Sequence, residues 1–173
     1  MPLTLVHRAG VDTVGKLEAA GSRRYREAES LFNAQQPLGA IYLFGYSVEV
    51  RLKVAYYRSI GLVSTSVIQG NVHRKPAEDA INGMFNATPR LPPGPSPGHH
   101  VIGWARLLEQ TRAANGTPLA IAIADQMHAH AQNLFLCWVE FLRYRGNKPY
   151  DMEVQAVRFA ARWFRANARR LWN

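Results

Sequence analysis

The C-terminal part of the chain carries a regular series of arginines. Arg158, Arg162, Arg165 and Arg169 are separated by steps of four, three and four residues. At about 100° per residue in a helix, their side chains lie within a strip about 60° wide. Guanidinium groups in line suit a polyanion, because arginine binds phosphate oxygens through paired N–H donors. A solvated helix face without a ligand would show the same pattern.

Apolar residues flank this arginine strip on both sides. Phe159 and Trp163 lie on one side, where rings beside arginines suit base stacking or a protein interface. The alternative is that both rings lie in the core. The opposite side is apolar and is expected to contact the core through Val157, Ala161, Phe164, Ala168 and Leu171.

A second basic group lies in the turn R-Y-R-G-N-K-P-Y at residues 143–150. Arg143, Arg145 and Lys148 are candidates for binding nucleic acid or a nucleotide. Equally, they suit the negative end of the preceding helix, whose dipole they would complement. Tyr150 closes the turn, and Asp151 is the predicted N-cap of the next helix.

The histidines and glycines exclude several other chemistries. His128 and His130 are two apart on a predicted helix and point in different directions, so we predict no metal site. The sequence has neither G-x-x-x-x-G-K-[ST] nor G-x-G-x-x-G, the phosphate-binding loops of common nucleotide folds. Arginines and helix ends would therefore have to hold any nucleotide, and no cofactor is predicted.

The element that must position these groups is a central helix over Pro37–Arg58. Ile41, Phe44, Val48, Leu52 and Ala55 recur at steps of three and four, and a second apolar row follows on a neighbouring face. A helix apolar on most of its circumference is expected to have partners on several sides. Its polar residues form a narrow strip of Tyr42, Glu49 and Lys53, in which the i,i+4 spacing predicts an ion pair between Glu49 and Lys53. Arg51 and Arg58 are expected to face solvent or a ligand.

The other periodic segments predict an all-α protein, an antiparallel up-and-down bundle of about five main helices. Residues 1–21 are predicted to be a flexible arm, and 22–173 a single domain. The expected helices are Arg23–Asn33 capped by Ser22, Pro37–Arg58, a short Pro76–Phe85, a segment from His99 to Asn115, one from Thr117 and Pro118 to Leu142, and a last one from Asp151 to about Leu171. A Pro-rich connection, T-P-R-L-P-P-G-P-S-P-G, joins the second and third main helices.

The overall charge favours an anionic partner. Lys and Arg number 21 against 12 Asp and Glu, a net charge of +9, which suits nucleic acid, a nucleotide or an acidic protein. A merely basic surface is the alternative. The lone Cys137 lies among large apolar residues and is predicted to be a buried thiol in a reducing compartment. The absence of a signal peptide or membrane-length apolar run predicts a cytoplasmic protein without a membrane partner.

One family resemblance rests on two stretches of the chain. A-I-Y-L-F-G-Y-S-V-E-V-R-L-K, preceded by R-Y-R-E-A-E-S-L-F-N-A-Q-Q and followed downstream by G-H-H-V-I-G-W-A-R-L-L, resembles the HEPN superfamily, especially its stand-alone bacterial members. The resemblance implies a helical bundle that binds RNA or a nucleotide. It also implies a homodimer, so it favours an interface for Phe159 and Trp163. A histidine at the position of His99 is frequent in that family.

The resemblance makes ribonuclease activity doubtful. Family nucleases carry R-x(4-6)-H at this basic turn, yet here Tyr150 occupies the position of the histidine. Imidazole exchanges protons near neutral pH, and a phenol does so poorly. We therefore expect RNA or nucleotide binding through Arg143, Arg145, Lys148 and the arginine strip, within a toxin–antitoxin or defence system. The alternative is a module that docks an acidic protein partner, such as the other half of a toxin–antitoxin pair.

Overall fold

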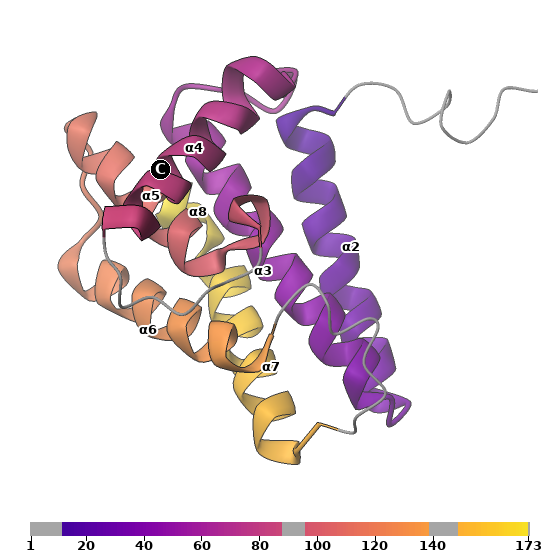
Figure 1. Cartoon of the computed structure of the whole chain (residues 1–173). Coiled ribbons are helices and arrows are strands. Elements are labelled where there is room, and N and C mark those ends of the chain that lie inside the picture. Colours follow the sequence, from indigo (N-terminus) through magenta and orange to yellow (C-terminus); the bar gives the residue numbers. More distant parts are fainter. Residues whose placement is uncertain (1–11, 88–95, 139–148, 173) are drawn as a thin grey trace, which may run out of the picture.

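The fold is a bundle of helices, shown in Figure 1 as a computed structural model that describes residues 12–87, 96–138 and 149–172. The predicted all-α class is confirmed. One isolated antiparallel bridge joins Thr13 and Val67. The α-helices are α2 (Val14–Asn33), α3 (Pro37–Ser59), α4 (Lys75–Ala87), α5 (Val101–Ala114), α6 (Ile121–Cys137), α7 (Asp151–Ala166) and α8 (Ala168–Trp172), with a π-helical turn η1 (Gly70–Arg74) and a 3-10 turn η2 (Pro97–His99).

Helix α3 is the central element, as its two apolar rows predict. It packs against α2, α5, α7 and α8, and the first apolar row, from Ile41 to Ala55, is buried. Pro37 starts the helix, where the missing N–H costs nothing. Gly61, with φ of 87°, lies just past its end, and the Gly61 N–H donates to the Arg58 carbonyl at 2.9 Å.

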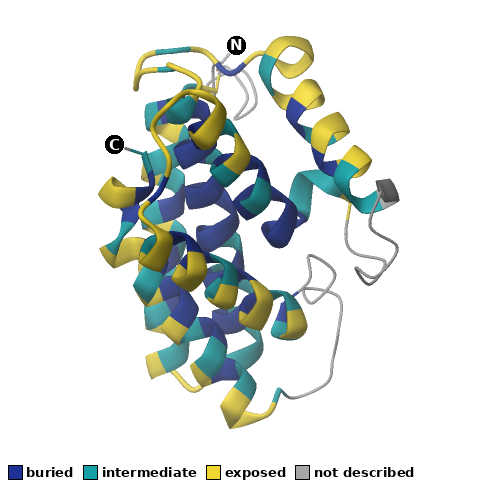
Figure 2. Cartoon of the chain, turned by 90° about the vertical axis from the view of Figure 1, so that its left-hand side faces the viewer, coloured by how far each residue is buried: buried dark blue, intermediate teal, exposed yellow. Residues whose placement is uncertain are grey.

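The remaining helices are arranged around α3. Helices α2 and α3 run side by side as an antiparallel pair (Figure 1). Helix α6 packs against α5 and α7, and α4 packs against α5 and the two short turns. Figure 2 shows the buried residues on the faces that the helices turn toward one another. Within the parts of the chain that the structure describes, the helices fall short of the length and apolar character that a membrane span requires.

The first helix begins earlier than predicted, so the arm boundary at residue 21 is wrong. Helix α2 starts at Val14, and the side chain of Thr13, rather than that of Ser22, caps it by accepting from the Lys16 N–H at 3.2 Å. Gly21, the last residue of the predicted arm, lies inside α2. A Cβ there would come within 2.9 Å of Val50, so the glycine allows α2 to approach α3 closely. Residues 1–11 of the predicted arm lie outside the described residues.

Helix α6 also departs from its predicted start. It begins at Ile121 rather than at Pro118, because the preceding segment is bonded to α5 instead of coiling. The Arg112 guanidinium donates to the Thr117 carbonyl at 2.7 Å, and the Thr117 N–H donates to the Arg112 carbonyl at 2.9 Å. The helix ends at Cys137, and the predicted end at Leu142 lies outside the described residues.

The predicted last helix is divided in two. Helix α7 ends at Ala166, and α8 begins at Ala168. Asn167 lies between them, and its side-chain amide donates to the Trp163 carbonyl at 3.0 Å. At the other end of α7 the N-cap is Tyr150 rather than Asp151, since the Tyr150 N–H donates to the Glu153 carboxylate at 2.7 Å. Similarly, His99 lies in η2, and His100 is the N-cap of α5.

Candidate functional site

The arginine strip on α7 faces a carboxylate on α2. Arg158 is mostly buried and donates to Glu29 at 2.7 and 3.3 Å, while its guanidinium lies 4.0 Å from the centre of the Phe32 ring. Arg162 is 54% exposed and reaches the same carboxylate at 3.4 Å. The strip is therefore partly neutralised within the protein, which the sequence pattern did not reveal.

The pKa of the Glu29 carboxyl reflects this contact. Burial alone would raise the pKa, but hydrogen bonds from Arg158 and Tyr25, with the charges of Arg158 and Arg162, hold it below its ordinary value. Glu29 is thus a carboxylate at neutral pH. It occupies two arginines in the way that a phosphate group would.

The remaining arginines of the strip are open to solvent. Arg165 is exposed and lies 4.7 Å from the centre of the Tyr25 ring. Tyr25, Glu29, Arg162 and Arg165 line a shallow hollow of about 600 Å³. Arg169 is exposed but belongs to α8, because the helix breaks at Asn167. The four arginines therefore do not share one continuous helix.

The two aromatic residues beside the strip differ in exposure. Phe159 is 67% exposed, so the alternative that it lies in the core is wrong. Trp163 is half-buried, and its indole N–H donates to the side chain of Gln126 on α6 at 2.8 Å. The His130 ring lies 5.3 Å from Phe159 and 5.0 Å from Trp163 between ring centres. These three rings form an aromatic surface across α6 and α7.

The basic turn is only partly visible. Arg143, Arg145 and Lys148 lie outside the described residues, so their relation to the arginine strip stays a prediction. Tyr150 is described, and its side chain is 78% exposed at the start of α7. It is accessible where the resembled motif would place a histidine.

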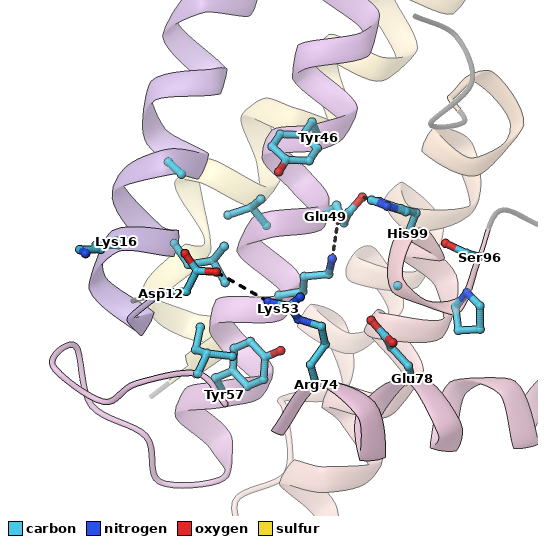
Figure 3. A pocket seen from close by; sticks show the side chains of 16 residues that line it. Asp12, Lys16, Tyr46, Glu49, Lys53, Tyr57, Arg74, Glu78, Ser96 and His99 are labelled. Atoms are coloured by element: carbon cyan, nitrogen blue, oxygen red, sulfur yellow. Dashed lines mark hydrogen bonds and ion pairs between the residues drawn. The ribbon is translucent and has the colours of Figure 1, made fainter. Parts of the chain in front are cut away.

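The polar strip of α3 faces a different side of the molecule. Glu49 is buried, with a side-chain exposure of 1%, and its two oxygens accept from Lys53 at 2.6 Å and from His99 at 2.9 Å. Figure 3 shows these three side chains turned toward one another in one cleft. Tyr42 does not join them. Its ring stacks on that of Tyr46, with centres 6.4 Å apart.

The contact between Glu49 and His99 joins the two stretches that carry the HEPN resemblance, 50 residues apart in the chain. The sequence predicted the Glu49–Lys53 pair from its spacing but assigned His99 only to a helix start. A buried carboxylate on an otherwise apolar helix needs more than one polar partner. This requirement could have indicated that Glu49 has a second partner besides Lys53.

Two further arginines of α3 are engaged within the protein, so the expectation that they face solvent or a ligand is wrong. Arg51 is buried, and one of its nitrogens lies 3.5 Å from the Ser22 hydroxyl. Burial lowers the pKa of Arg51. Arg58 donates to Glu18 at 2.8 Å and to Ser64 at 3.0 Å.

The candidate metal ligands have separate surroundings. His128 contacts Glu109 at 2.7 Å, whereas His130 faces the aromatic rings, so the two histidines do point in different directions. The described residues contain no group of three His, Cys, Asp or Glu side chains close enough to hold a metal ion. Cys137 is half-buried rather than fully buried, and burial raises the pKa of its thiol.

Comparison of the chain with protein-family models, with curated proteins and with solved structures gave no match. The fold and the site define a class: an all-α bundle with exposed arginines on one face of α7.

Proposed function

We propose that this protein is a HEPN-like protein that binds single-stranded RNA, or a nucleotide, on its basic face. The observation that carries the proposal is the pair of exposed arginines, Arg162 and Arg165, on one side of α7 beside the Glu29 carboxylate, which Arg162 binds. The chain's net charge of +9 would add long-range attraction. Arg143, Arg145 and Lys148 would extend the same surface.

Glu29 gives the proposal a specific mechanism. It holds Arg158 and Arg162 through charge-assisted bonds of 2.7 to 3.4 Å. A backbone phosphate of RNA could replace it, because its two non-bridging oxygens and negative charge suit the same arginines, and neighbouring phosphates along the strand add further contacts. RNA would then bind by displacing the Glu29 carboxylate from these arginines, rather than by binding arginines that have no partner in the protein.

Binding without cleavage is the activity we propose. The position that carries the motif histidine in related nucleases is Tyr150, and a phenol is a poor proton acceptor near neutral pH. If Tyr150→His confers RNA cleavage, the turn is a degenerate nuclease motif. If the wild-type protein cleaves RNA and Arg143→Ala leaves cleavage intact, the site lies elsewhere.

The experiment is a salt titration of binding to a labelled single-stranded RNA, followed by fluorescence anisotropy. Each phosphate contact on a single strand contributes roughly −0.7 to the slope of log K against log salt. Replacing both Arg162 and Arg165 by Ala should make the slope shallower by about 1.4. Glu29→Gln should raise the affinity and steepen the slope, since it releases two arginines.

Lys75→Ala is the matched control, because Lys75 is an exposed cation on α4, paired with Asp79 and remote in sequence from the strip. It should change the affinity little. A complete lack of RNA and nucleotide binding at low salt would contradict the proposal.

That outcome would favour the second candidate, docking of an acidic protein partner. The contact of Glu29 with Arg158 and Arg162 supports this candidate too, because it shows that the strip accepts a carboxylate. An acidic peptide that competes with Glu29 would then bind more tightly to the Glu29→Gln variant.

A further inference from the structure

A second cleft, of about 470 Å³, lies away from the arginine strip. Its walls come from Asp12 and the start of α2, the middle of α3, η1, the start of α4 and η2, and Figure 3 shows Asp12, Lys53, Arg74, Glu78 and His99 around it. None of the residues that line it belongs to the arginine strip. Whatever this cleft binds, it is a site distinct from the proposed RNA surface.

Glu49 forms the floor of the cleft and holds two donors in place. Both of its carboxylate oxygens are bonded by the protein, one to Lys53 and one to His99. A buried ion pair contributes little to stability after desolvation, so the fold does not need these charges for its core. Buried charged groups at the edge of a cleft are common in binding sites.

His99 is presented to the cleft by a fixed turn. The Trp104 indole N–H donates to the Gly98 carbonyl at 3.1 Å, which anchors η2 to α5. Lys53 lies 5.4 Å from the centre of the same Trp104 ring. The imidazole and the ammonium group therefore have defined positions before any ligand arrives.

The opposite wall adds a guanidinium group and a phenol. Arg74 is 52% exposed, and its pairing with the 71% exposed Asp12 is long, at 3.7 Å. Such an exposed pair is weak and exchanges easily. Tyr57 lies beside Arg74, and burial raises the pKa of its phenol to about 12, so the phenol remains a donor. Tyr57 itself is only 2% exposed, so Lys53 and Arg74 are the groups that offer N–H donors to one small anionic group.

Two carboxylates limit which anion fits. Asp12 and Glu78 also face the cleft, so its net charge is close to balanced and it has no surplus of positive charge to attract a polyanion. A ligand with one phosphate group and several hydroxyl or amino groups satisfies both sets, because the phosphate accepts from the cations and the hydroxyl or amino groups donate to the acids.

We propose that this cleft binds a small organic phosphate bearing hydroxyl or amino groups, with Lys53 and Arg74 on the phosphate and Glu49 as the positioning residue for Lys53 and His99.

Isothermal titration calorimetry of the full chain with ribose 5-phosphate, ribose and inorganic phosphate tests this assignment. Ribose 5-phosphate should bind saturably at one site, inorganic phosphate more weakly, and ribose not measurably. Arg74→Ala should lower the affinity for ribose 5-phosphate at least tenfold, about the loss of one charge-assisted contact. Arg74 is a suitable target because its exposed side chain is not part of the core.

The double replacement of Arg162 and Arg165 by Ala is the matched control and should leave this binding unchanged. Lys53→Met combined with Glu49→Gln removes the buried pair together, so that neither charge is left unpaired, and should abolish binding while the circular dichroism spectrum stays helical.

Absence of saturable binding by the wild-type protein would overturn the proposal. So would affinity that Arg74→Ala does not change, or ribose binding as tightly as ribose 5-phosphate. Inorganic phosphate binding as tightly as the sugar phosphate would refute the role of Asp12 and Glu78. None of these results depends on whether RNA binds the arginine strip.

Discussion

His100 is a histidine that the folded protein keeps neutral. Its side chain is 2% exposed, and its ring lies between those of Phe85 and Phe135, with centres 3.9 and 4.7 Å away. Its Nδ1 accepts from the Gly103 N–H at 3.2 Å and so caps α5. The other ring nitrogen has no hydrogen-bond partner among the described residues. Burial lowers the pKa of His100 to about 4, against an ordinary value of 6.5.

Acid should therefore destabilise the protein through this residue. Between about pH 6.5 and pH 4 the unfolded chain binds a proton at His100 that the folded chain does not, so stability falls as the pH falls through this window. The loss should be of the order of 3 kcal/mol, as measured by denaturant unfolding.

His100→Asn is the matched variant for this prediction, because asparagine also caps helices and does not titrate. The difference between the wild-type and variant stabilities should change with pH in the window from 6.5 to 4 and be constant above it. Parallel stability curves for the two proteins would show that His100 is not the titrating group.

At the scale of elements, the contact between Gly45 on α3 and Trp138, the residue after α6, determines how closely α3 and the end of α6 approach. Gly45 faces the Trp138 indole so closely that a Cβ would overlap the ring. The indole N–H donates to the Tyr42 carbonyl at 3.1 Å, which fixes the ring against α3. A glycine in mid-helix, which lowers helix propensity, is here required by packing.

Gly45→Ala should destabilise the protein by roughly 1 to 3 kcal/mol, because the ring must shift or leave its position. Gly83→Ala is the control: Gly83 lies in α4, and a Cβ there would meet no atom within 4 Å. It should be neutral or stabilise the protein by up to about 1 kcal/mol. Equal denaturant midpoints for the two variants would contradict the packing explanation.

At the scale of the whole molecule, the aromatic surface of Phe159, Trp163 and His130 is partly open to solvent in the described part of the chain: Phe159 is exposed, and the other two rings are half-buried. The HEPN resemblance implies a homodimer, and this surface is where we propose that two copies meet. Light scattering should report a dimer. Phe159→Glu should shift it toward monomer, because a charge would be buried in an apolar interface.

Val63→Glu is the corresponding control, since Val63 is also an exposed apolar residue, at 60%, but lies in the segment after α3. It should leave the dimer intact, and both variants should keep wild-type helicity by circular dichroism. A wild-type monomer at high concentration would refute this interface.

Much of the architecture was predictable from local patterns. The apolar steps of three and four in Pro37–Arg58 predicted the central helix to within one residue, and the predicted end of the next long segment at Asn115 lies one residue past the end of α5. Predictions of helix boundaries from single residues failed where contacts between distant segments determine the local structure. Gly21 looked like a boundary but packs against Val50, and Pro118 looked like a helix start but follows Thr117, which is bonded to Arg112.

The contacts at the two candidate sites also fall into those that spacing along one helix predicts and those that join distant segments. The sequence by itself determined that Arg158, Arg162 and Arg165 share one face of α7 and that Glu49 pairs with Lys53, because both follow from spacing along one helix. Only the tertiary structure decided that Glu29, 129 residues before Arg158, neutralises part of the strip. It also decided that His99 and Arg74 join Glu49 and Lys53 at one cleft, since helical periodicity specifies the face of a residue but not the element packed against it.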